Sequence, residues 1–382
     1  MNIVTTTKQL NDLCKTLSKQ EFVTIDLEFL RDKTYYAKLC LIQIACIDEA
    51  AIIDPLAPDI NLTSFFKLLQ NKKIVKVFHS CRQDIEIIYN LTDSIPEPLF
   101  DTQIAAMVCG FGESISYENL VSKILGKPLD KTSRLSDWSQ RPLSQNQLEY
   151  ALSDVTHLVN IYQFMTKNLT ETGRLKWLDE EKEILKDPKT YKVDPKEVWH
   201  KIKHRSHSSH YLTLLRELAE WREHRAQNKD TVRQSIIKDE VLLNIAAMNP
   251  KNIQELEQVR NMRKDIANGK LGAEIVEVLQ NADKLPKSQW VVIEKEQKQT
   301  QGSTALFELL KLLLRIRSTE QGVVARLIAT DDELKAFSAF KDKHNPILKG
   351  WRYEIFGKDA EALRDGRLSI RFDKNKNKID IH

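Results

Sequence analysis

The chain has 382 residues, of which 41% are hydrophobic and 29% are charged. This composition is typical of a globular protein of two or three domains and excludes a disordered or fibrous one. The net charge of +4 is divided unevenly, with −3 on residues 1–170 and +7 on the remainder. An acidic part followed by a basic part fits a metal-using catalytic unit joined to modules that contact a polyanion.

The chain lacks the sequence features of a membrane or secreted protein. Its strongest apolar segment, Ala305–Ile316, is interrupted by Glu308, Lys311 and Arg315 and predicts an amphipathic helix. The first residues lack the charged and apolar regions of a signal peptide. Five cysteines without metal-ligand spacing indicate buried thiols in a reducing compartment. We therefore expect a cytoplasmic protein that does not contact a membrane.

Residues 22–29 predict a β-strand with two different faces. The odd positions are apolar, whereas Thr24, Asp26 and Glu28 fall on the opposite face. Two carboxylates that point the same way from a core strand are costly to bury unless a cation neutralises them. Hard oxygen ligands suit Mg²⁺ or Mn²⁺. An edge strand with a solvated acidic face explains the same short motif.

Strands and helices then alternate along the chain. Two further strands are predicted at 36–46 and 51–53, and polar turns between them favour antiparallel hairpins. After a short helix, the strand 74–78 leads into a second helix, with Ser80 as the expected N-cap and Asp84 in its first turns. Three antiparallel strands followed by strand–helix units indicate a mixed α/β sheet covered by helices.

A long helix is predicted from Ser144 to about residue 165. Ser144 and Gln147 have the spacing of a capping box. Tyr150 and Asp154 are four residues apart and therefore project from neighbouring positions of this helix. Each candidate has an ordinary structural explanation as well: Asp84 suits a helix N-terminus, and Tyr150 suits a half-buried aromatic position.

Three segments together resemble the motifs of the DEDD 3′→5′ exonucleases, in the subgroup whose third motif is Tyr-x-x-x-Asp. Within that subgroup the chain is most similar to the bacterial ribonuclease D family. Leu27 stands where the family commonly has a small polar residue, but it points away from the acids. Glu149 occupies the position at which the other subgroup has histidine. The segments are VTIDLEFLRDKTYYAKLCLIQ (23–43), KVFHSCRQD (76–84) and WSQRPLSQNQLEYALSD (138–154).

The resemblance implies a ribonuclease H-like fold and a two-metal hydrolysis. Two divalent cations, Mg²⁺ or Mn²⁺, would lie roughly 3.5–4 Å apart and would be held by Asp26, Glu28, Asp84 and Asp154. Tyr150 would orient the attacking water, because a phenol that titrates near 10 is a poor base at neutral pH. The implied activity releases nucleoside 5′-monophosphates from RNA 3′ ends, with trimming of tRNA precursors as the implied role.

Substrate-binding residues are less clearly indicated. Lys131, Arg134 and Trp138 form a basic–aromatic segment that suits phosphate binding and base stacking, although Trp138 also suits the core. Phe29 is expected to wedge against the terminal base, or to pack in the core by its parity with Ile25. His79, within the second motif, completes the predicted substrate-binding set.

The C-terminal half resembles two HRDC modules, which are small helical bundles associated with nucleic-acid binding. Residues 221–246 carry the resemblance, although Val232 stands where a proline usually precedes Arg233. Residues 350–357 resemble the divergent second module of the family, and a strand at 368–372 and a frayed tail are expected after it. The predicted division is a catalytic domain 1–170, a connector 171–204, an HRDC domain 205–283, a linker 284–303 and a second HRDC-like domain 304–382, with both bundles all-α.

Two alternative functions remain open from the sequence. A DNA exonuclease would use the same chemistry and would differ in a contact to the 2′-hydroxyl group. A non-catalytic RNA-binding scaffold would keep the fold without the reaction. In each case we expect nucleic acid as the partner, a monomer, and no obligate protein partner.

Overall fold

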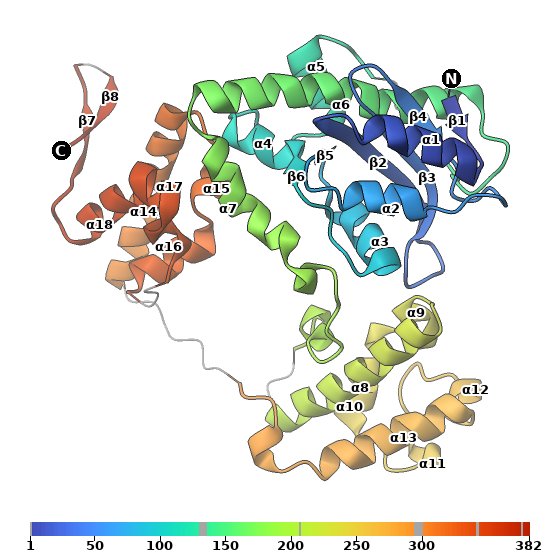
Figure 1. Ribbon diagram of the computed structural model, residues 1–382. Helices are drawn as coiled ribbons and strands as arrows, with labels where there is room; N and C mark the ends of the chain where they lie inside the picture. The colour runs from blue at the N-terminus through green and yellow to red at the C-terminus, as the bar shows by residue number, and fades with distance from the viewer. Residues whose placement is uncertain (1, 130–135, 206–207, 294–300, 341–343, 376) are drawn as a thin grey trace.

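The computed structural model describes residues 2–129, 136–205, 208–293, 301–340, 344–375 and 377–382. A sheet with its covering helices forms the N-terminal part, and two groups of helices follow (Figure 1). In these residues no helix combines the length and the apolar character that crossing a bilayer requires. All five cysteines are free thiols, and Cys109 alone among them is not fully buried.

The sheet is mixed and has the acid-bearing strand in its interior. Its strand order is β1-β4-β3-β2-β5-β6. The β2–β3 and β3–β4 pairs are antiparallel, whereas β2–β5 and β5–β6 are parallel. The predicted order of three antiparallel strands followed by parallel ones is therefore confirmed. The strands are Asn2–Val4 (β1), Phe22–Leu30 (β2), Lys38–Ala45 (β3), Ala50–Ile53 (β4), Val75–Phe78 (β5) and Leu99–Asp101 (β6).

Helices cover both faces of this sheet. On one face, Val23 and Ile25 of β2 share a hydrophobic core with Leu10 of α1, Phe65 of α2 and Ile88 of α3. On the other face, α6 crosses β2, β3 and β4 and continues towards the C-terminal helices (Figure 1). The helices are Thr7–Leu17 (α1), Thr63–Leu69 (α2), Arg82–Thr92 (α3), Thr102–Val108 (α4), Tyr117–Leu125 (α5) and Gln145–Glu171 (α6).

The predicted capping of α6 is confirmed, and that of α3 is wrong. Ser144 caps α6 in a capping box with Gln147. In contrast, α3 begins at Arg82, and Ser80 adopts a left-handed backbone with φ of 58°. The amide groups of Ser80 and Cys81 donate to the Asp101 carboxylate at 3.0 and 2.9 Å. The Asp101 side chain of β6 thus fixes the backbone just before α3, and no side chain caps the first turn of this helix.

A connector leads from the sheet to the first helical bundle. Residues 221–246, which carry the HRDC resemblance, lie mainly on the bundle's helices α8, α9 and α10. Leu215, Leu242 and Leu279 lie in its core. The elements are Leu175–Lys186 (α7), Pro188–Thr190 (η1), Val198–Lys201 (η2), Ser209–Asn228 (α8), Arg233–Ile236 (α9), Asp239–Met248 (α10), Ile253–Glu257 (α11), Lys264–Ala267 (α12), Lys270–Asp283 (α13) and Lys287–Gln289 (η3).

The last unit is helical and ends in a β-hairpin, so the strand predicted at 368–372 is confirmed, whereas the predicted frayed tail is wrong. Ile370 of β7 pairs with Ile381 of β8, and both pack against the apolar core. Burial of these two side chains explains why a Lys- and Asn-rich terminus is ordered. The elements are Gln301–Gln321 (α14), Ala325–Ile328 (α15), Asp331–Ser338 (α16), Pro346–Leu348 (η4), Gly350–Arg352 (α17), Tyr353–Gly357 (η5), Lys358–Arg364 (α18), Ile370–Asp373 (β7) and Lys378–Ile381 (β8).

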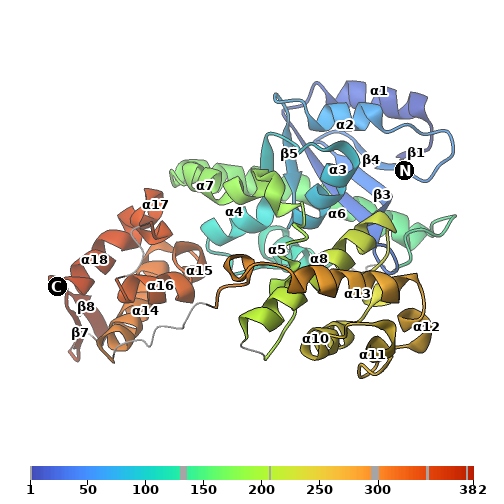
Figure 2. The same cartoon turned by 90° about the horizontal axis from the view of Figure 1, so that it is seen from below.

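This last unit is docked firmly on the helices of the N-terminal part (Figure 2). Trp351 stacks on Trp177 of α7, with ring centroids 4.5 Å apart. Beside this stack, Arg352 forms an ion pair with Glu181 of α7. The apolar side chains of both units belong to one continuous core. Removing the unit would therefore expose apolar surface on the N-terminal part.

Candidate active site

The polar face of β2 lies under α6, and this packing brings the first and third motifs together. Thr24 is fully buried, and its hydroxyl donates to the Val155 carbonyl at 2.9 Å. Asp154 precedes Val155 on α6, so its carboxylate lies beside those of Asp26 and Glu28. Ligand oxygens of the three acids lie within 4.8 Å of one another.

The fourth acid enters the same cavity from α3. Asp84 lies in the first turn of this helix and is 7% exposed. Together with the other three acids it lines a cavity of about 580 Å³. Asp84 is not among the three acids whose oxygens approach within 4.8 Å. The structure therefore brings all four predicted acids to one cavity, and oxygens of three of them lie within 4.8 Å of one another.

Burial of these acids raises the pKa of every carboxyl group. Burial is the largest cause in each case, and the neighbouring acids add to it for Glu28, Asp84 and Asp154. The pKa of Asp26 rises to about 6, that of Asp154 to about 8 and that of Glu28 to about 9. Four acids that cannot all ionise together form a strong site for cations, and their hard oxygen donors fit Mg²⁺ or Mn²⁺.

Tyr150 stands at the edge of the acid cluster. Burial, together with the nearby carboxylates of Asp154, Glu28 and Asp26, raises its pKa far above the usual value of a phenol. A phenol with a raised pKa stays protonated at neutral pH and acts as a hydrogen-bond donor. Its ring lies 6.1 Å from that of Trp138.

The predicted substrate-binding residues lie in different environments, some in the cavity wall and one in the core. Phe29 and His79 line the cavity, and Phe29 also packs against the core of α1, α2 and α3. Trp138 is 2% exposed and packs between β3 and α6. It offers no face for a base, so the expected stacking role is not supported and the core alternative holds. Lys131 and Arg134 lie outside the described residues.

A hydrogen bond from one ring nitrogen holds the His79 side chain in one orientation. Its Nδ1 atom lies 3.0 Å from the Thr102 hydroxyl. Within the described part of the chain, its buried Nε2 atom has no hydrogen-bond partner. Burial lowers the pKa of His79, so the ring is neutral at physiological pH. Because His79 lines the cavity, its neutral ring can pack against a bound substrate.

Tyr117 is a cavity residue that the motifs did not indicate. Its hydroxyl donates to the Asp154 carbonyl at 2.6 Å, and its ring lies 5.5 Å from that of His79. It therefore braces the helix turn that carries Asp154. The available sequence signal was Ser116, which caps α5 through the Asn119 amide. That pattern predicts a helix start, but only the fold places this start against α6.

Comparisons with known proteins agree with the geometry. Residues 1–170 match the family model described as "3'-5' exonuclease", and residues 212–279 match the HRDC domain. "Ribonuclease D" of Granulibacter bethesdensis is 41% identical over 378 residues, which are 99% of this chain and 96% of that protein. "Ribonuclease D" of Zymomonas mobilis is 42% identical over 377 residues, covering 98% and 96%.

A solved structure extends the likeness to the whole fold. The crystal structure of Escherichia coli RNase D, described as "an exoribonuclease involved in structured RNA processing", superposes with a TM-score of 0.81. The match has 27% identity and covers 96% of this chain and 99% of that one. The resemblance found in the three motifs is therefore confirmed. The chain belongs to the ribonuclease D family and is a 3′→5′ exoribonuclease.

Proposed function

We propose that the acid cluster holds two divalent ions, Mg²⁺ or Mn²⁺, and that the enzyme uses them to remove single nucleotides from RNA 3′ ends. The observation that carries this proposal is the convergence of Asp26, Glu28 and Asp154 within 4.8 Å, beside Asp84 in one cavity. Bound divalent ions would neutralise the acids, lower the pKa of water and stabilise the charge that develops on the phosphate.

Individual residues of the cavity have separate roles in the reaction. Tyr150 donates a hydrogen bond and orients the attacking water, whose oxygen bonds to the last phosphodiester phosphorus. The bond from phosphorus to the preceding 3′ oxygen breaks, which yields a nucleoside 5′-monophosphate and an RNA with a new 3′-hydroxyl. Phe29 and His79, both in the cavity wall, contact the terminal nucleotide. Tyr117 keeps the Asp154 turn in place through its hydrogen bond to the backbone.

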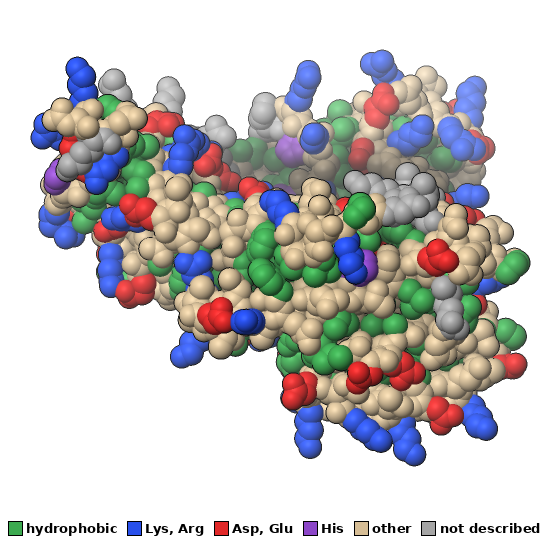
Figure 3. All heavy atoms as spheres, turned by 90° about the horizontal axis from the view of Figure 1, so that it is seen from above, with side chains coloured by type: hydrophobic (Ala, Val, Ile, Leu, Met, Phe, Trp, Pro, Cys, Tyr) green, Lys and Arg blue, Asp and Glu red, His purple; other side chains and the backbone are tan. Residues whose placement is uncertain are grey.

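The natural substrates of the enzyme are structured RNAs with short 3′ extensions, and tRNA precursors are the class that we propose. The E. coli relative acts in structured RNA processing by its description. The net charge of +7 on residues 171–382 favours contact with a polyanion. On the face drawn in Figure 3, Lys and Arg side chains are interspersed with Asp and Glu.

The proposed division into domains is consistent with this function. We propose a catalytic domain at 1–170, a connector at 171–204, an HRDC domain at 205–283, a linker at 284–303 and a second HRDC-like domain at 304–382. We also propose that the enzyme is a cytoplasmic monomer without an obligate protein partner.

The test compares RNA and DNA hairpins of matched sequence, each with a 5′ label and a single-stranded 3′ extension. With Mg²⁺ or Mn²⁺ we expect stepwise shortening of the RNA from its 3′ end, release of nucleoside 5′-monophosphates and a stop near the stem. With EDTA we expect no products. Equal digestion of the DNA would support the DNA exonuclease alternative, and binding without any digestion would support the scaffold. A tRNA precursor with a 3′ trailer then tests the proposed substrate class.

A further inference from the structure

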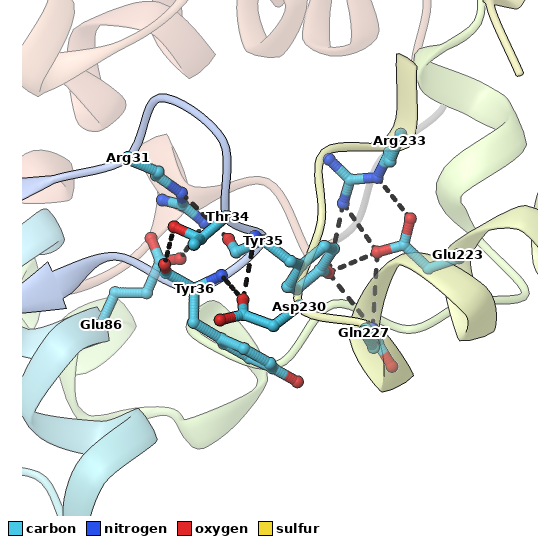
Figure 4. Close-up of polar contacts among 9 residues, drawn as sticks. All are labelled: Arg31, Thr34, Tyr35, Tyr36, Glu86, Glu223, Gln227, Asp230 and Arg233. Carbon is cyan, nitrogen blue, oxygen red and sulfur yellow. Dashed lines mark hydrogen bonds and ion pairs between the residues drawn. The ribbon is translucent and has the colours of Figure 1, made fainter. Parts of the chain in front are cut away.

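A tyrosine of the catalytic domain is built into the core of the first helical bundle. Tyr35 lies in the loop between β2 and β3 and is 8% exposed. Its side chain belongs to the same hydrophobic cluster as Leu215, Leu218 and Leu242 of the bundle. Figure 4 shows its ring passing from the loop into the bundle, towards Glu223. The contact is therefore an insertion of one unit into the other.

The polar contacts of Tyr35 are complete. Its hydroxyl donates to Glu223, while Gln227 and Arg233 each donate to its oxygen at 3.2 Å (Figure 4). A tyrosine hydroxyl has one donor and two acceptor positions, so every position is used. The guanidinium of Arg233 also lies 5.1 Å from the centre of the Tyr35 ring. Such a network holds the ring in one orientation.

The bundle grips the loop backbone as well. Asp230 has φ of 45° and follows the end of α8. One of its carboxylate oxygens accepts from the Tyr35 and Tyr36 amides at 3.0 and 2.9 Å (Figure 4). Hydrogen bonds from backbone amides to a charged carboxylate are stronger than neutral ones. Two successive peptide units of the loop are thus fixed to the bundle.

The same loop is tied to two of the three elements that carry acids. It continues directly from β2, whose end bears Glu28 and the cavity residue Phe29. Within the loop, Arg31 donates to the Tyr35 carbonyl at 3.2 Å and to Glu86 at 2.7 Å. Glu86 lies on α3, two residues after the acid Asp84. A chain of contacts therefore runs from the bundle through the loop to β2 and α3.

We propose that the first bundle positions the acid cluster by holding the β2–β3 loop through Tyr35 and Asp230. In this role the bundle acts on turnover through the catalytic domain, independently of any contact that it makes with RNA. Loss of the grip frees the loop and loosens the spacing of β2 relative to α3. Because the four acids must converge to bind cations, the effect appears in the metal dependence of the reaction. The proposal rests on the metal site described under Proposed function.

The experiment uses the full-length enzyme, a short RNA oligonucleotide and a Mg²⁺ titration, with Asp230→Ala, Tyr35→Phe and Glu223→Gln as variants. We expect kcat to fall and the half-saturating Mg²⁺ concentration to rise, each by about tenfold for Asp230→Ala, the range typical of residues that orient metal ligands. KM for the oligonucleotide should stay within about twofold of the wild-type value, since positioning residues act mainly after binding.

A matched control comes from the same bundle. Glu274 accepts hydrogen bonds from Trp221 and Arg225, so Glu274→Gln breaks a comparable network within the bundle. This variant should keep the wild-type Mg²⁺ dependence. A charge-reversal pair tests the next link: Arg31→Glu should raise the half-saturating Mg²⁺ concentration, and Arg31→Glu combined with Glu86→Arg should reverse part of that rise. The restored ion pair would not repair a general loss of stability elsewhere.

The outcomes separate this proposal from the metal site itself. Wild-type kcat and Mg²⁺ dependence in folded Asp230→Ala and Tyr35→Phe enzymes, or an equal defect in Glu274→Gln, would overturn it. A rise in KM alone would assign the bundle to RNA binding instead. If Asp26→Asn is inactive while the loop variants behave as wild type, the proposed metal site stands and the positioning role fails. If Asp230→Ala does not fold, Tyr35→Phe, which removes only the hydroxyl that contacts Glu223, still decides the question.

Discussion

Replacement of Asp26 by asparagine should have opposite effects on the stability of the metal-free enzyme and on the activity of the metal-bound enzyme. The change keeps the size of the side chain and removes one charge from the centre of the site. Asp26 contributes to the raised pKa of Glu28, Asp84 and Asp154. In the metal-free enzyme it is therefore a source of repulsion, whereas in the metal-bound enzyme it is a ligand. The substitution should stabilise the first form and disable the second.

The size of the stabilisation follows from the distances. Oxygens of Asp26 lie within 4.8 Å of those of Glu28 and Asp154, and two full charges at that separation repel by roughly 3 kcal/mol at an effective dielectric constant of 20. Partial protonation of the raised groups reduces this value. We therefore expect Asp26→Asn to raise the free energy of unfolding at pH 8 in EDTA by about 1–2 kcal/mol, which corresponds to a Tm increase of roughly 2–4 °C.

Activity should move in the opposite direction. Loss of several kcal/mol of transition-state stabilisation corresponds to a fall in kcat of about a thousandfold. Thermal unfolding with and without Mg²⁺, together with single-turnover cleavage of end-labelled RNA, measures both effects. Glu149→Gln, an exposed acid one residue before Tyr150, is the control and should change neither quantity. A lower Tm in EDTA, or activity near that of the wild type, would refute the reasoning.

Three further results are expected. Tyr150→Phe should lower the single-turnover rate by about a hundredfold, the low end of the range for a side chain positioned at the reacting groups, while the half-saturating Mg²⁺ concentration stays unchanged. An unchanged rate would exclude the water-orienting role. The metal-free enzyme should lose stability as pH rises from about 5 to 9, because the raised pKa values of Asp26, Asp154 and Glu28 mean that the native state binds more protons than the unfolded state. In thermal unfolding with Mg²⁺ the change of Tm with pH should have the opposite sign, and a Tm that rises with pH in EDTA would contradict the prediction. Lys76→Met should lower the free energy of unfolding in urea by about 3 kcal/mol, since the buried Lys76 ammonium donates to three backbone carbonyls that would lose their partner. A loss below about 1 kcal/mol would show that water replaces the ammonium group.

The strand that carries the acids could be predicted because its determinants are local. Alternation along residues 22–29 places the apolar side chains on one face and the acids on the other, and the structure has this arrangement. The capping box at Ser144 is equally local and is confirmed. The convergence of Asp84 and Asp154 on Asp26 was available only from the family resemblance, because periodicity does not reveal which elements of a sheet become neighbours.

The failures of prediction share a physical cause, which is contact between distant parts of the chain. The backbone before α3 is held by Asp101 of β6, and Ser80 does not cap the helix. Trp138 is buried because α6 and β3 close over it, although its neighbours in sequence are basic and polar. Tyr35 reads as one residue of an ordinary polar turn, and its partner Glu223 is 188 residues away. No local pattern distinguishes such a residue from a solvent-exposed one.

The most direct test of the account is to locate the metal ions. Crystals of the enzyme grown or soaked with Mn²⁺ and measured for anomalous scattering would show each ion as a separate peak. The account predicts two peaks in the cavity, bounded by the carboxylates of Asp26, Glu28, Asp84 and Asp154, and the loss of at least one of them in Asp26→Asn. An absence of peaks from this cavity at saturating Mn²⁺, with ions bound elsewhere on an active enzyme, would contradict it.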